Sequence, residues 1–371
     1  MPGSAHQPPR PWRDPEQDRE HPRGEPDQMV KLWVSYKPSE PFAYLALPQR
    51  LPEVRDPEEV IAIVCPGQGS QTPGFLTPWL EMPGLREQLT QLSDAVGIDL
   101  VAHGTTSDEE TIRDTAVAQP LIVAAGLLTA AAVATQSPPD VLAGHSVGEI
   151  TAAAISGALT EADAVGFVAA RAKGMAAASA VTPTGMSAVL GGDSDDVVSA
   201  LEALGLTPAN MNGAGQIVAA GTLEQLADLA AAPPARARVI PLKVAGAFHT
   251  DHMAPAVEPL TAFAARITAS SARIPVLSNR DGAQLTDGPE ILQRLVAQVT
   301  SPVRWDLCMQ AMQEAGVTGL IELAPAGTLV GLAKRGLKGV EALAVKTPDD
   351  LDAAARMLRD HTSSATEGGI E

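Results

Sequence analysis

The chain has 371 residues, of which 45% are hydrophobic, so it can bury a large core and form two or three structural units. Lys and Arg number 26 against 44 Asp and Glu, a formal net charge of −18 that argues against nucleic acid as the main partner. The two cysteines, Cys65 and Cys308, have no Cys or His neighbour at metal-ligand spacing, so we expect buried thiols in a reducing compartment, without a disulfide framework or a metal site.

The first 57 residues differ in composition from the rest. Residues 1–28 combine proline, glycine and charge with almost no apolar side chains, and residues 29–57 are interrupted by prolines, so we expect a disordered or irregular extension over 1–57. No secretion signal is recognisable there. The longest apolar stretch, 121–134, is shorter than the about 20 residues that a membrane-spanning helix needs. We therefore expect a cytoplasmic protein that has no membrane segment.

From Val60 onward, strand patterns alternate with helix patterns. Val60–Cys65 is a continuous apolar, largely β-branched run ended by Pro-Gly, which is typical of a strand covered on both faces. Strands that alternate with helices indicate a parallel α/β sheet. In this part we predict helices at 84–96, at 117–135 and from about Ser146 onward, and a short strand at 140–143.

Between residues 183 and 245 the order becomes strand, helix, strand, strand, helix, strand, which matches a ferredoxin-like split βαβ unit. The parallel pattern then resumes. The predicted fold class is therefore α/β, a hydrolase-like parallel-sheet domain (58–182 and 246–348) with an inserted small ferredoxin-like α+β subdomain (183–245), followed by a C-terminal helix and frayed tail (349–371). The predicted strands are 186–190, 207–211, 216–220, 238–244, 274–278 and 319–323, and the helices are 194–204, 222–231, 253–268, 290–298, 306–315 and 327–335.

The segment Gly144–Gly148 is a G-x-S-x-G element that lies between a predicted strand and a predicted helix. Glycine on each side of Ser146 removes Cβ clashes from a sharp turn, and a helix N-terminus directs free N–H groups at a bound carbonyl. These features fit a serine nucleophile. A plain helix start with Ser146 as its N-cap fits the same letters.

A serine hydroxyl needs a base to become a nucleophile at neutral pH, and histidine is the usual one. Position leaves His249 and His252 as candidates, and His249 lies where the inserted unit returns to the sheet, an edge where active sites commonly form. An ordinary buried or surface histidine is the alternative. The histidines set aside are His6 and His21 in the N-terminal extension, His103 in a loop, His145 beside the serine and His361 near the C-terminus.

Two further features have both a functional and an ordinary interpretation. Gly67–Gln71 follows the first strand and offers backbone N–H groups at the same sheet edge, although a glycine turn after a strand is common. Arg171, if buried, can hold a carboxylate through two parallel hydrogen bonds. As a solvated helix residue it would have no such role.

Six motifs, in order from about Val60 to Val345, resemble those of the malonyl-CoA:acyl carrier protein transacylase family. The resemblance implies a monomeric enzyme without bound cofactor or metal. It would transfer the malonyl group from malonyl-CoA to the phosphopantetheine thiol of acyl carrier protein, by a ping-pong mechanism through a malonyl-Ser146 ester, for fatty acid biosynthesis. The motifs are Pro66–Gln71, Gly144–Glu149, Arg171 with Met175, Asn212–Val218, Ala247–His249, and Gln298 followed by Ser301–Trp305.

The resemblance assigns catalytic roles position by position. Ser146 would be the acylated nucleophile and His249 the general base and acid. The backbone carbonyl of Gln298 would orient His249 in place of a triad acid. The backbone N–H groups of Gln68 and Val147 would form the oxyanion hole. Val147 departs from the leucine that is commoner in the family.

The resemblance also implies substrate contacts. Arg171 would bind the free carboxylate of the malonyl group, and the Gln68 side chain would contact the acyl group. Phe248 goes with malonyl rather than methylmalonyl, although one methyl group decides only about 1–3 kcal/mol. His145 and Asn212 complete the candidate substrate-binding set.

An acidic carrier protein must dock on this acidic chain through a local cationic patch. The candidates are Lys334, Arg335 and Lys338, which would otherwise only complement a helix C-terminus. Three alternative functions stay open: a polyketide-pathway acyltransferase, a serine esterase or thioesterase, and a non-catalytic carrier-protein-binding subunit. An esterase would not need Arg171, and a binding subunit would have no reason to keep Ser146 and His249 together with it.

Overall fold

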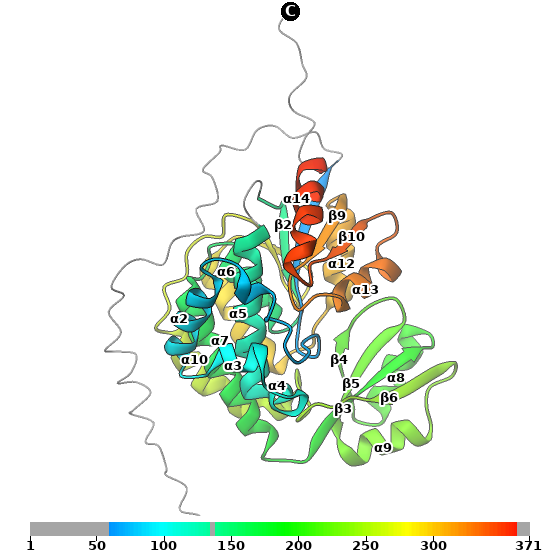
Figure 1. The fold of residues 1–371 in the computed structure, drawn as a ribbon. Coiled ribbons are helices and arrows are strands. Elements are labelled where there is room, and N and C mark those ends of the chain that lie inside the picture. The colour runs from blue at the N-terminus through cyan, green and yellow to red at the C-terminus, as the bar shows by residue number, and fades with distance from the viewer. Residues whose placement is uncertain (1–58, 134–137, 362–371) are drawn as a thin grey trace, which may run out of the picture. The chain divides into compact units, whose positions relative to one another are not determined.

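The computed structural model describes residues 59–133 and 138–361, all of which lie in one compact unit, Leu45–Glu371. The extension predicted over 1–57 and nearly all of the predicted tail lie outside the described residues. Figure 1 shows the described part as a large sheet flanked by helices and a smaller sheet with helices of its own. The α/β fold class is thus confirmed.

The larger sheet has the strand order β10-β9-β1-β2-β7-β8, and all its pairs are parallel except β7 with β8. Its strand β1 (Val60–Cys65) is buried at every residue but the first, as its continuous apolar sequence predicts. Because β1 and β2 are parallel neighbours, their carboxyl ends meet at one edge of this sheet. The other strands are β2 (Val141–Gly144), β7 (Val276–Leu277), β8 (Gln284–Leu285), β9 (Val317–Glu322) and β10 (Glu341–Ala344).

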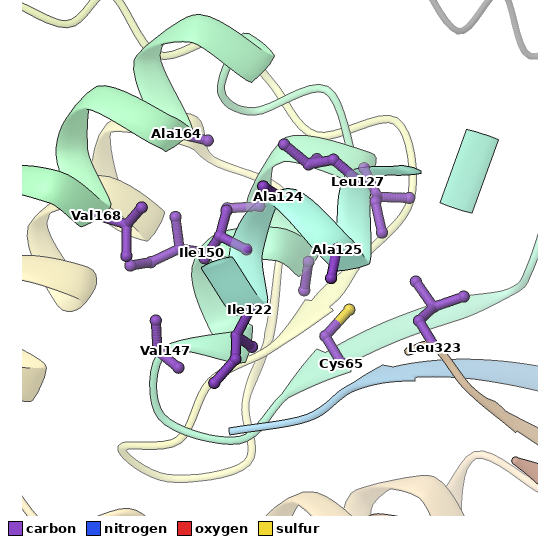
Figure 2. Close-up of a cluster of buried hydrophobic side chains, with 14 of the residues drawn as sticks. Cys65, Ile122, Ala124, Ala125, Leu127, Val147, Ile150, Ala164, Val168 and Leu323 are labelled. Carbon is purple, nitrogen blue, oxygen red and sulfur yellow. The ribbon is translucent and has the colours of Figure 1, made fainter. Parts of the chain in front are cut away.

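Alternate residues of β1 face two different hydrophobic clusters. Ile61, Ile63 and Cys65 belong to the larger one, and Ala62 and Val64 to the smaller. Figure 2 shows part of the larger cluster, in which Cys65 and Leu323 lie near helical side chains such as Ile122 and Ala125. The helices of this face are α2 (Leu85–Val96), α3 (Leu100–Thr105), α4 (Glu109–Arg113), α5 (Thr115–Val133), α6 (Gly148–Ile155), α7 (Glu161–Ser179), α10 (Val257–Ala264), α11 (Gly288–Ala297) and α14 (Leu351–Asp360), and those of the other face are α12 (Trp305–Glu314) and α13 (Thr328–Gly336).

Helix α5 is long and apolar enough to cross a membrane by length and composition alone. In the structure, however, 78% of its apolar window is buried inside the protein. It is therefore the core helix that the sequence predicts for this stretch. Both cysteines are buried and unpaired, as predicted.

The smaller sheet has the strand order β4-β5-β3-β6 with every pair antiparallel. This is the order of a ferredoxin-like unit, so the predicted strand-helix-strand-strand-helix-strand sequence folds as such a unit does. The unit contacts the larger sheet's layer through a bridge between Asn210 and Val303. Its elements are β3 (Thr184–Gly191), α8 (Ser194–Ala203), β4 (Thr207–Met211), β5 (Gln216–Thr222), α9 (Leu223–Ala231) and β6 (Ala237–Pro241).

Some predicted elements differ from those observed. The helix predicted over 253–268 is a 3₁₀ turn, η3 (Asp251–Ala256), followed by α10, because Pro255 has no N–H for a continuous α-helix. The strand predicted to reach residue 244 ends at Pro241, which also lacks the donor. The short 3₁₀ turns η2 (Trp79–Glu81), η4 (Gln298–Thr300) and η5 (Pro348–Asp350) are not among the predicted elements.

Candidate active site

The G-x-S-x-G element, Gly144–Gly148, forms a sharp turn between β2 and α6, which we call the elbow. Its central residue, Ser146, has a φ of 53°, in the left-handed region. A Cβ on Gly144 would lie 2.0 Å from the carbonyl carbon of Gly148, and one on Gly148 would lie 2.2 Å from the Cys65 oxygen. Backbone therefore passes too close to admit any side chain at either glycine. The N-cap of α6 is Val147 with no side-chain cap, so the interpretation of Ser146 as N-cap is wrong.

Ser146 and His249 are in direct contact. The Ser146 Oγ lies 2.7 Å from His249 Nε2, and His249 Nδ1 lies 2.9 Å from the backbone oxygen of Gln298. A carbonyl oxygen only accepts, so Nδ1 carries the hydrogen and Nε2 presents its lone pair to the serine hydroxyl. Among the described residues no carboxylate contacts His249. His252, the other candidate, does not line the cavity described below.

The imidazole of His249 is 3% exposed. Burial lowers its pKa, the positive charge of Arg171 acts in the same direction, and the resulting pKa is about 3. The folded protein therefore holds His249 neutral, which is the form that accepts a proton from Ser146.

Arg171 lies on α7 with 1% of its surface exposed, so the interpretation as a solvated helix residue is wrong. Its NH1 donates to Gln119 Oε1 at 2.5 Å, and its NH2 donates to Gln298 Oε1 at 2.8 Å and lies 3.3 Å from Ser146 Oγ. Within the described residues its Nε has no hydrogen-bond partner. Burial lowers the pKa of Arg171 to about 10, so the guanidinium stays charged at neutral pH.

Two backbone N–H groups near Ser146 have no hydrogen-bond acceptor among the described residues. In the described part of the chain, the N–H groups of Gln68 and Val147 donate no hydrogen bond. The N–H of Ser146, in contrast, donates to Asn279 Oδ1 at 2.7 Å. The Gln68 side chain donates to the carbonyl of Arg113 at 3.3 Å.

A cavity of about 300 Å³ opens over Ser146. Every site residue that the sequence predicts lines it, except Gln298, which lies behind it and reaches it through His249 and Arg171. Phe248 is 7% exposed on its wall. The Nε2 of His145 donates to Asn212 Oδ1 at 2.8 Å, and desolvation lowers the pKa of this histidine. In the described residues, no group of three or more His, Cys, Asp or Glu could hold a metal ion.

Three residues of the site carry contacts that the sequence analysis does not predict. Gln119 on α5 holds the Arg171 guanidinium, and Asn279 holds the Ser146 backbone. Glu149 accepts hydrogen bonds from Asn279 N and from Gln298 Nε2. The signals for the last two are weak: Asn279 follows a strand at the sheet edge of the elbow, and Glu149 is the one charged residue of an otherwise apolar or small helix, α6.

The profile of the acyl transferase domain family matches residues 62–368. The chain belongs to this family. It is 54% identical over 302 residues to the malonyl CoA-acyl carrier protein transacylase of Mycobacterium tuberculosis, an alignment that covers 80% of this chain and 100% of the relative. The enzyme of the same name from Escherichia coli is 33% identical over 305 residues, with 80% and 99% covered.

Solved structures of malonyl transacylases have the same fold as this chain. The crystal structure of the Mycobacterium tuberculosis enzyme superimposes with a TM-score of 0.77 at 53% identity, covering 80% of this chain and 99% of that one. A malonyl-transacylase solved in complex with its type II polyketide acyl-carrier protein gives a TM-score of 0.76 at 30% identity, covering 80% and 99%. Within the acyl transferase family, the chain is thus a member of the malonyl-CoA:acyl carrier protein transacylases.

Proposed function

We propose that this transacylase moves the malonyl group from malonyl-CoA to the phosphopantetheine thiol of acyl carrier protein through an ester on Ser146. The observation that carries the proposal is the buried guanidinium of Arg171, 3.3 Å from the nucleophilic oxygen. A neutral acyl group would leave that charge without a partner, whereas a malonyl carboxylate would accept its N–H donors. A serine esterase would have no use for a buried cation at this place.

In the first half-reaction, Ser146 Oγ attacks the thioester carbon while its proton passes to His249 Nε2. The backbone N–H groups of Gln68 and Val147 stabilise the resulting oxyanion, and such a donor is worth about 3 kcal/mol. The C–S bond then breaks, and the departing thiolate takes the proton from Nε2. Malonyl-Ser146 and CoA–SH are the products.

The second half-reaction repeats these steps with the carrier protein. Its phosphopantetheine thiol gives its proton to His249 Nε2 and attacks the ester carbon, the ester C–O bond breaks, and Ser146 recovers the proton. Gln298 keeps His249 in one tautomer through both halves because its backbone oxygen accepts the Nδ1 hydrogen. The wall residue Phe248 favours malonyl over a branched extender, and His145 and Asn212 line the same cavity.

The carrier protein docks, in this proposal, at the end of α13. Lys334, Arg335 and Lys338 are exposed there. Arg335 lines the cavity and donates a hydrogen bond at 3.2 Å to Oε1 of Gln216, which lies on strand β5 of the smaller sheet. A carrier at this patch would deliver its phosphopantetheine arm directly into the cavity. We further propose that the enzyme acts as a cytoplasmic monomer and serves fatty acid biosynthesis.

The decisive experiment is intact mass spectrometry of the protein and of Ser146→Ala after mixing with malonyl-CoA, followed by addition of a carrier protein that bears phosphopantetheine. The expected result is a malonyl increment on the parent alone, discharged onto the carrier. CoA release without a lasting adduct or a labelled carrier would instead identify a hydrolase. If no CoA were released, the result would favour the alternative function of a non-catalytic carrier-protein-binding subunit.

A further inference from the structure

Glu149 is a buried carboxyl group that the mechanism above does not use. It is 4% exposed on the first turn of α6 and contacts neither the Ser146 hydroxyl nor His249. Its Oε1 accepts the N–H of Asn279 at 2.9 Å, and its Oε2 accepts a hydrogen bond from Gln298 Nε2. Burying an ionisable side chain costs free energy of folding unless its contacts compensate, so Glu149 depends on these two hydrogen bonds.

The Gln298 side chain links Glu149 to Arg171. An amide has one donor end and one acceptor end, and an ionised carboxylate can only accept. Glu149 therefore holds the Nε2 end, which leaves Oε1 facing Arg171 NH2 at 2.8 Å. If the amide were turned, its N–H groups would face those of the guanidinium and its oxygen would face the carboxylate. Both contacts would be repulsive.

The charges at the two ends of this link are complementary. Burial raises the pKa of Glu149, its hydrogen bonds and the nearby charge of Arg171 oppose this rise, and the resulting pKa is about 7, so the charged carboxylate predominates above that pH. Burial lowers the pKa of Arg171, which Glu149 in turn opposes. Carboxylate, amide and guanidinium thus form one polar chain in which each group favours the orientation of the next.

We propose that Glu149 is a positioning residue for Arg171: through the side chain of Gln298 it fixes the guanidinium in the orientation that receives the substrate's carboxylate. The proposal rests on the function proposed above, because it concerns how the enzyme selects a malonyl group. Glu149 sets acyl selectivity without touching the substrate.

The same carboxylate has a second contact, which the test must separate from the first. Asn279, whose N–H it accepts, holds the elbow by accepting from Ser146 N and donating to the Gly144 oxygen at 2.7 Å. Damage to the elbow would slow every acyl group equally. Damage to Arg171 positioning would slow malonyl alone, so the ratio of malonyl to acetyl loading distinguishes the two effects.

The test compares single-turnover loading of Ser146 from malonyl-CoA and from acetyl-CoA in Glu149→Gln and in a matched control, Glu161→Gln. Like Glu149, Glu161 is a carboxylate that accepts a hydrogen bond from a glutamine, Gln88. Unlike Glu149, it is only partly buried and lies at the start of α7, outside the cavity. We expect Glu149→Gln to lower the malonyl to acetyl ratio about tenfold. The control should keep the parent ratio.

A second variant guards against misfolding of the first. Gln298→Leu keeps the backbone oxygen that orients His249 but removes the amide, so it should lower the same ratio by a similar factor. Combining Arg171→Ala with Glu149→Gln should lower the ratio no further than Arg171→Ala alone. Equal losses for both acyl groups in Glu149→Gln, or an unchanged ratio in Gln298→Leu, would overturn the positioning role. Failure of the parent itself to form malonyl-Ser146 would overturn the proposed function instead.

Discussion

Arg171 affects two neighbouring groups of the active site, the imidazole of His249 and the hydroxyl of Ser146. Its guanidinium contributes to the low pKa of His249, and its NH2 lies between Gln298 Oε1 and Ser146 Oγ. The same positive charge thus helps to keep His249 unprotonated and, in the proposed function, pairs with the malonyl carboxylate. Loss of Arg171 should therefore affect selectivity more than it affects the chemistry at Ser146.

Arg171→Ala should lower single-turnover malonyl loading about 100-fold and acetyl loading by less than about threefold, because only malonyl has a carboxylate to pair with the buried guanidinium. Loading is measured by intact mass at saturating acyl-CoA, with circular dichroism to check folding. Equal losses for the two acyl groups would show that Arg171 does not bind the carboxylate.

The protonation state of His249 predicts an unusual pH profile. A group with a pKa lowered to about 3 binds no proton between pH 7.5 and pH 5.5, so the base stays neutral throughout this interval. A histidine with an ordinary pKa near 6.5 would lose about tenfold of its neutral form over the same interval. Acetyl-CoA is the substrate to use, since it has no carboxylate for Arg171 to bind. The Glu149→Gln variant is the background to use, since the pKa of Glu149, about 7, lies within this interval and its carboxyl group also holds Asn279 at the Ser146 turn.

We therefore expect the rate constant for acetyl loading of Ser146 to change less than about twofold between pH 7.5 and pH 5.5. A profile that follows one proton with a pKa near 6.5 would contradict the buried, neutral state of His249. The charged and titratable groups that face this imidazole are Arg171 and His145, and both act to lower its pKa.

At the scale of elements, the sequence predicts best where the pattern has a single physical cause. The strand Val60–Cys65 is found as predicted because a doubly covered strand must be apolar throughout. Helix α7, which carries Arg171, is not predicted, since its many alanine and glycine residues pack on several sides and leave no apolar stripe. Strand β10 is not predicted either, because it is short and none of its residues is fully buried.

The elbow is the element on which catalysis depends most directly. Gly148→Ala would place a Cβ 2.2 Å from the backbone oxygen of Cys65, so β1 and α6 must move apart. We expect a loss of at least about 2 kcal/mol in the free energy of unfolding and loss of Ser146 loading. Urea unfolding and intact mass after malonyl-CoA measure the two effects.

The control for the elbow variant is Gly331→Ala in α13, where an added Cβ meets nothing within 4 Å. There the higher helix propensity of alanine should raise stability by up to about 1 kcal/mol. Tolerance of alanine at both positions would show that the turn does not require glycine at residue 148.

At the scale of the whole molecule, the site joins segments that the sequence separates widely. Gln68 follows β1, Ser146 follows β2, and Gln298 follows α11, yet hydrogen bonds and the cavity bring them together. The motif pattern predicts which residues meet, but the supporting contacts of Gln119 and Asn279 depend on side-chain packing that no local pattern reports. Parallel strands explain part of this convergence, since their carboxyl ends share one edge.

The chain's net charge of −18 makes the cationic end of α13 the feature to test for carrier docking. Lys334→Glu with Lys338→Glu should lower the rate of malonyl discharge onto an acidic carrier protein about tenfold at low salt, because the first contact is electrostatic. Both side chains are exposed and neither lines the cavity, so loading from malonyl-CoA should stay within about twofold of the parent. High salt should reduce the difference in discharge rate between the variant and the parent.

The matched control, Arg86→Glu with Arg356→Glu, makes the same charge change on exposed residues of α2 and α14. If this control slowed discharge equally, net charge rather than the α13 patch would govern the encounter.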